Sequence, residues 1–88
     1  MPYTPTLLTS FVQGELARAA EHIEDAVVYL QLRNLIAAVE SFRRATLVMD
    51  IVEHYLESAV EDRRVASYQV SIQTTRERIR ALSGTILP

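Results

Sequence analysis

Two histidines are the residues of this chain best suited to chemistry at a metal ion. His22 and His54 each have carboxylates within one helical turn, at Glu21, Glu24, Asp25, Glu53 and Glu57. A histidine and a carboxylate at such spacing can chelate a metal ion, as in helical di-iron sites. Ligands in those sites project into the bundle interior, whereas these residues fall outside every apolar stripe of the chain. We therefore expect no metal ligand and no cofactor, and a metal-binding helical bundle is the second alternative function.

Signatures of enzyme active sites are missing from the sequence. The chain has no cysteine, so it offers neither a thiolate nucleophile nor a disulfide. Its two glycines, Gly14 and Gly84, stand too far apart to form a loop that cradles phosphate. A Gly-x-Ser-x-Gly motif is also absent. These observations favour a protein that is not an enzyme.

All nine basic residues are arginines, and they are unevenly distributed. Residues 63–88 carry five arginines and one acid, whereas residues 1–62 carry four arginines and ten acids. A basic C-terminal helix could bind nucleic acid, and the candidate residues are Arg63, Arg64, Arg76 and Arg80. The same helix could instead fold back against acidic neighbours, which the overall net charge of −2 favours. A nucleic-acid-binding accessory protein is therefore the first alternative function.

Three apolar stripes with helical spacing predict an all-α fold. The stripes run from Val12 to Leu30, from Leu35 to Ala59 and from Val65 to Leu82. Each is out of phase with the one before it, which predicts turns near 33–34 and 61–64. Short turns between helices of this length predict an antiparallel three-helix bundle. No glycine or proline marks the second turn, so a helical hairpin followed by one long bent C-terminal helix is the alternative.

The expected domain organisation is a single helical domain between two short ends. Two early prolines predict an extended leader over 1–8, and a hydroxyl side chain at 9 or 10 can cap the first helix. Gly84 is the expected C-cap of the last helix, so the domain covers 9–83 and a tail covers 84–88. No apolar run approaches the length of a membrane span, and the N-terminus lacks a basic signal region. We expect a cytoplasmic protein without membrane contact.

The segment around the first turn resembles a tetratricopeptide-type helical hairpin. The residues that carry this resemblance are Ala26, Tyr29, Asn34, Ala38, Phe42 and Ala45. In such a hairpin small residues let the two helices approach, and an aromatic ring fills the gap beside them. The layout of the whole chain is similar to the three-helix microtubule-interacting-and-trafficking domains, which take up amphipathic segments of partners beside their third helix. The resemblance implies a protein-binding module, and the same spacing also fits a generic three-helix bundle.

The middle helix carries more apolar residues than one packed face needs. Leu47, Val48 and Ile51 lie off its main stripe, as do Val27 and Val28 on the first helix. A chain of 88 residues has too small a core to bury all of them. We expect these five residues to form an interface in a homo-oligomer, foremost a symmetric dimer, or against a partner helix. The sequence thus predicts a non-enzymatic protein–protein interaction or oligomerisation module.

Overall fold

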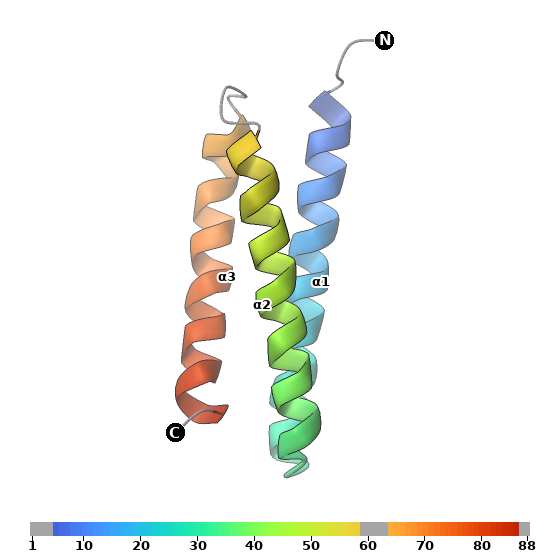
Figure 1. Cartoon of the computed structure of the whole chain (residues 1–88), viewed down its shortest axis with the longest axis vertical. Coiled ribbons are helices and arrows are strands. Elements are labelled where there is room, and N and C mark those ends of the chain that lie inside the picture. Colours follow the sequence, from blue (N-terminus) through green and yellow to red (C-terminus); the bar gives the residue numbers. More distant parts are fainter. Residues whose placement is uncertain (1–4, 59–63, 87–88) are drawn as a thin grey trace.

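The chain folds into three α-helices. The computed structural model describes residues 5–58 and 64–86, with the side chains of 10–57 and 68–86. The helices are α1 (Pro5–Gln31), α2 (Leu35–Ser58) and α3 (Arg64–Ile86), and these described ranges contain no strand. Successive helices run in opposite directions, so α3 runs parallel to α1 (Figure 1). The predicted all-α, antiparallel three-helix bundle is confirmed.

The first turn ends α1 and starts α2 within three residues. Arg33 adopts a left-handed conformation with φ of 59°. Its N–H donates to the carbonyl of Leu30 at 3.0 Å, and the N–H of Asn34 donates to the carbonyl of Tyr29 at 2.8 Å. This pair of hydrogen bonds is the Schellman closure of a helix C-terminus. Asn34 also caps α2, because its Oδ1 accepts a hydrogen bond from the N–H of Ala37 at 3.2 Å.

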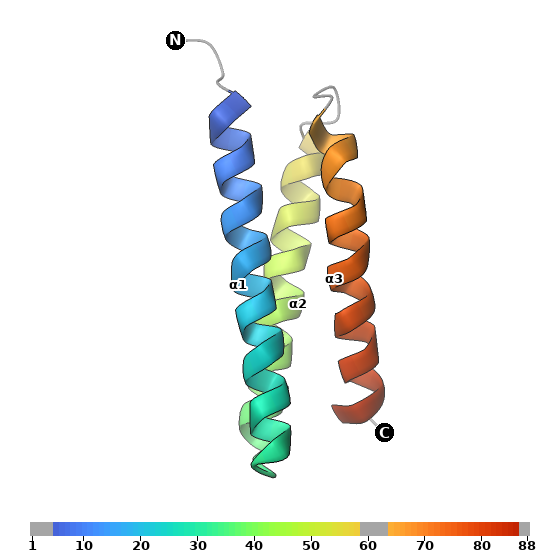
Figure 2. The ribbon, with the colours of Figure 1, turned by 180° about the vertical axis from the view of Figure 1, so that it is seen from behind.

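α2 and α3 are separate helices that run in opposite directions (Figure 1), so the alternative of one long bent C-terminal helix is wrong. α2 ends at Ser58, and α3 begins at Arg64 and returns alongside α2. Figure 2 shows the same arrangement from behind, with both α2 and α3 lying beside α1. The sequence predicts the turn near 61–64, and residues 59–63 lie outside the described residues.

Both ends of the helical domain differ from the expectation. α1 begins at Pro5, inside the segment expected to be an extended leader. Proline is well tolerated in the first turn of a helix, where its missing N–H would have no helical partner. α3 continues through Gly84 to Ile86, and Gly84 does not adopt the left-handed conformation of a C-cap. Ile86 is buried one turn beyond Leu82, so core packing draws the helix past the glycine.

The core combines a close α1–α2 contact with larger side chains along all three helices. Four alanines, Ala19, Ala26, Ala38 and Ala45, are fully buried. Three of them belong to the tetratricopeptide-like spacing, which is explained by close approach of α1 and α2. The larger buried side chains are Val12, Ile23, Met49, Val52, Leu56, Tyr68, Ile72, Ile79, Leu82 and Ile86. α1 and α2 form the most extensive helix pair, and α3 packs against both.

The bundle is a rod of 49 × 20 × 15 Å. α3 stops short of the α1–α2 turn, so the tip of that hairpin projects beyond the end of α3 (Figure 1). Within the described residues, no helix combines the length and the apolar character needed to cross a bilayer. The side of α2 that faces away from the core and the projecting hairpin tip are therefore the parts of the bundle left open for contact with other molecules.

Candidate functional site

Exposed apolar side chains are concentrated on the α1–α2 hairpin. Among the described side chains, the large exposed apolar ones are Val27, Val28, Leu32, Leu35, Ile36, Leu47, Ile51, Tyr55 and Val70. Only Val70 of this described set belongs to α3. Tyr55 is at the edge of exposure, and its ring centroid lies 4.5 Å from that of Phe11 on α1. Apart from Val27, the remaining residues form two separate groups along the hairpin.

The first group lies on what we call the outer face of α2, which comprises Glu40, Leu47, Ile51 and His54. Helical spacing places these residues opposite the buried Ala45, Met49 and Val52, and all four are exposed. Leu47 is 59% exposed and Ile51 is 46% exposed, one helical turn apart. The outer face is therefore an amphipathic surface with two aliphatic side chains at its centre.

The five predicted interface residues differ in location and in burial. Leu47 and Ile51 share the outer face, whereas Val27 and Val28 are exposed near the far end of α1. Val48 is half-buried and packs against the core, because it lies on the side of α2 that turns toward α1. The five residues therefore do not form one continuous patch, and their part in association stays a prediction.

The second group, which we call the hairpin tip, comprises Val28, Leu32, Leu35 and Ile36. Ile36 is 83% exposed, the highest value among the described large apolar side chains. The sequence analysis named Val28 as an interface residue, missed Leu32 and Ile36, and placed Leu35 at the start of a core stripe. Leu35 is exposed because α3 ends before it reaches the hairpin tip (Figure 1). The sequence signal for the exposure of Leu35 was the length of the third apolar stripe, which is shorter than the second.

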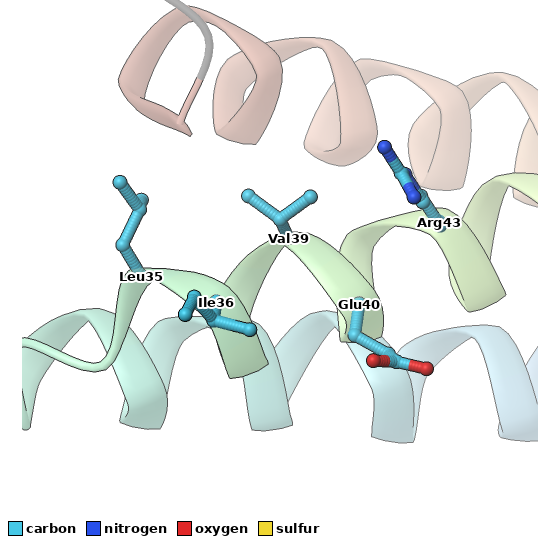
Figure 3. Close-up of a pocket in the computed structure, with 5 residues that line it drawn as sticks. All are labelled: Leu35, Ile36, Val39, Glu40 and Arg43. Carbon is cyan, nitrogen blue, oxygen red and sulfur yellow. The ribbon is translucent and has the colours of Figure 1, made fainter.

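A shallow hollow of about 290 Å³ borders the hairpin tip. Leu35, Val39 and Arg43 point from α2 toward the C-terminal end of α3, whereas Ile36 and Glu40 point elsewhere (Figure 3). The lining is aliphatic at one end and carries the Arg43 guanidinium at the other. Such an open, mostly apolar hollow suits a side chain of a protein partner better than a reacting small molecule.

The strongest polar contact joins α3 to α2. Arg76 Nε donates to Glu53 Oε1 at 2.7 Å, and its Nη2 donates to Glu53 Oε2 at 2.9 Å and to Asp50 Oδ1 at 2.7 Å. The hydrogen bond to Glu53 is the main cause that raises the pKa of Arg76 above its ordinary high value, and it outweighs the opposing effect of partial burial. Arg76 is therefore a permanent cationic clamp between the two helices.

The arginines predicted for nucleic-acid binding do not share one exposed surface. Arg76 is engaged by Glu53 and Asp50, as expected for a basic helix that folds against acidic neighbours. Arg80 is exposed one turn further along α3. Arg63 and the side chain of Arg64 lie outside the described part of the structure. The described portion of α3 therefore lacks an aligned row of free arginines, and nucleic-acid binding stays an untested prediction.

The histidines lie on different helices and outside the core. His22 is half-buried on α1, and His54 is exposed on α2 with its Nδ1 3.9 Å from Glu57 Oε2. In the part of the chain that the structure describes, no three His, Asp or Glu side chains come together as a metal site would require. The alternative of a metal-binding bundle thus gains no candidate ligand set from the described residues.

Comparisons with known proteins do not assign this chain to a family. No protein-family model, no curated protein and no solved structure matches it. We therefore infer the function of the chain from the surface of the bundle itself.

Proposed function

We propose that this chain is a non-enzymatic helical interaction module that self-associates through the outer face of α2. The observation that carries the proposal is the exposure of Leu47 and Ile51, one turn apart, on a helix whose opposite face is already filled by the core. Exposed aliphatic side chains that gather on one face are typical of protein–protein contact surfaces. A second α2 offers the same aliphatic pair in return, which is what a symmetric interface requires.

The energetics indicate that this aliphatic pair needs support from its surroundings. Burying the exposed half of a leucine or isoleucine contributes roughly 1 kcal/mol. Four such side chains in a dimer would contribute roughly 4 kcal/mol, which is comparable to the smallest cost of bringing two molecules together. Association at micromolar concentration therefore requires favourable polar contacts around the pair as well.

Sedimentation of the purified chain over a range of concentrations tests the proposal. We expect a monomer–dimer equilibrium that is populated at tens of micromolar. Leu47→Glu should weaken it at least about ten-fold, because a buried, unpaired carboxylate is costly to desolvate. Leu47 is the preferred position because Val48 also packs against the core, so that Val48→Glu would perturb the fold.

Val70→Glu is the matched control, since Val70 is 75% exposed on α3 and lies away from the outer face. This variant should associate as the wild type does. A wild type that remains monomeric at tens of micromolar would overturn the proposal. Loss of association in Leu32→Glu, with Leu47→Glu unaffected, would also overturn it, by transferring the contact to the hairpin tip.

A further inference from the structure

We infer that the partner on the outer face is a second copy docked antiparallel, related by a two-fold axis that lies between the two α2 helices, perpendicular to them and level with the midpoint of Leu47 and Ile51. This inference rests on the proposed self-association and adds the orientation of the two copies and the residues that face each other. Three features of α2 support it: the spacing of the aliphatic pair, the order of charges along the helix, and the clamp formed by Arg76.

The aliphatic pair is self-complementary in the antiparallel orientation. Leu47 and Ile51 lie one turn apart, so a two-fold axis midway between them places Leu47 opposite the second copy's Ile51, and Ile51 opposite its Leu47. Both contacts then involve branched aliphatic side chains of similar volume. The antiparallel arrangement also opposes the two helix dipoles favourably.

The charges on α2 follow an order that favours the same orientation. Arg43, Asp50 and Glu57 are spaced by seven residues, so they lie along one line on the side of α2 nearest α3. Arg43 is exposed and makes no ion pair with another described residue, and the Glu57 side chain is 79% exposed. Antiparallel docking places Arg43 near the second copy's Glu57 at both ends of the interface. Parallel docking would instead separate Arg43 from the second copy's Glu57 by about 20 Å along the helix.

Arg76 lessens an unfavourable encounter in this arrangement. Asp50 lies close to the axis, so it would approach the second copy's Asp50. The guanidinium of Arg76 binds Asp50 Oδ1 at 2.7 Å as well as Glu53, so it offsets part of the charge of these two carboxylates. On the outer face itself, Glu40 is paired with Arg44 at 3.4 Å, so this pair adds no net charge.

Cysteine cross-linking measures the orientation directly, because the chain has no cysteine of its own. Under mild oxidation, a mixture of Leu47→Cys and Ile51→Cys chains should form a cross-linked dimer on a non-reducing gel. Ile36→Cys should not cross-link with itself, since antiparallel docking separates the two positions by on the order of 40 Å along the helix. Efficient self-cross-linking of Ile36→Cys would overturn the inference, whether through parallel docking or through contact between hairpin tips.

Charge reversal provides a second test that does not depend on cysteine. Arg43→Glu and Glu57→Arg should each weaken dimerisation about ten-fold, and the two changes in one chain should restore the affinity to within about three-fold of wild type. Arg78→Glu, an exposed change on α3, serves as the control.

The outcomes separate the inference from the proposal on which it rests. A wild type that dimerises normally, with no rescue in the doubly reversed chain, would overturn the antiparallel orientation and leave self-association standing. A wild type that does not dimerise at all would overturn both.

Discussion

Arg33 occupies the position at which helices that end in a Schellman closure usually carry glycine. Its φ of 59° brings the Cβ of an L-residue close to its own backbone, at a cost of roughly 1 kcal/mol. The strain is tolerated because the residue that follows is used twice. Asn34 donates its N–H to the end of α1 and accepts a hydrogen bond at the start of α2. Two adjacent residues thereby define the hairpin that carries the candidate surface.

We predict that Arg33→Gly stabilises the protein by about 0.5–1 kcal/mol. Glycine adopts a positive φ without steric cost, and this relief exceeds the greater freedom that it gives the unfolded chain. Urea denaturation followed by circular dichroism measures the change. Arg33→Ala retains the Cβ and should show no comparable gain. An equal gain in both variants would attribute the effect to the lost charge rather than to the backbone.

At the scale of the element, α3 depends on one apolar stripe and one ionic clamp. Its described polar residues occupy most of the remaining surface, and Val70 is exposed rather than packed. Arg76 reaches from the middle of α3 to two carboxylates on α2. The clamp therefore fixes the alignment of α3 along α2, and it also stabilises the packing of the two helices.

Arg76→Ala should lower the free energy of unfolding by about 1–2 kcal/mol. The estimate is at the low end for charged hydrogen bonds because Asp50 and Glu53 remain partly exposed and solvent screens the pairs. Denaturation of the variant and of wild type at matched pH measures the loss. Arg80→Ala, an exposed change one turn away, should cost much less.

The pH dependence of this loss has a defined sign. The pKa of Arg76 is raised in the folded protein, so its stabilisation is complete below the ordinary arginine pKa and is lost only as the pH rises through the raised value. The cost of Arg76→Ala should therefore be the same at about pH 6 and about pH 9. A cost that declined across this range would show that another titrating group controls the contact.

At the scale of the whole molecule, the bundle consists of a tightly packed hairpin and a third helix added to it. α1 and α2 meet along fully buried alanines, whereas α3 has less extensive contact with each of them. Close helix approach and a short, doubly hydrogen-bonded turn both stabilise the hairpin. Local opening of the structure should therefore begin at α3.

Hydrogen exchange followed by mass spectrometry should reveal this difference. Amides in the centre of α3 should exchange at least about ten-fold faster than those in the centres of α1 and α2. Arg76→Ala should accelerate exchange in α3 selectively, whereas Arg33→Gly should leave the difference between α3 and the hairpin in place. Equal protection of all three helices would contradict this division of the molecule.

The helices and their breaks could be predicted from the sequence because both are local properties. The apolar spacing specifies a helical stripe within a few turns, and a shift in its phase marks where one helix must end. The apolar pattern correctly predicted the turn at Arg33 and Asn34 and the separation of α2 from α3. It also found the alanines of the α1–α2 contact, since small residues at helical spacing indicate close approach.

Burial and partnership were decided by the tertiary structure, because both depend on how distant segments align. Leu35 is exposed, although the pattern placed it in the core. Leu47 is exposed too, as a residue predicted to lie at an interface should be in a single chain. The exposure of Leu35 depends on where α3 ends relative to the hairpin, and the pairing of Arg76 depends on the alignment of α3 along α2. The length of α3 was likewise set by burial of Ile86, which no local signal at Gly84 could indicate.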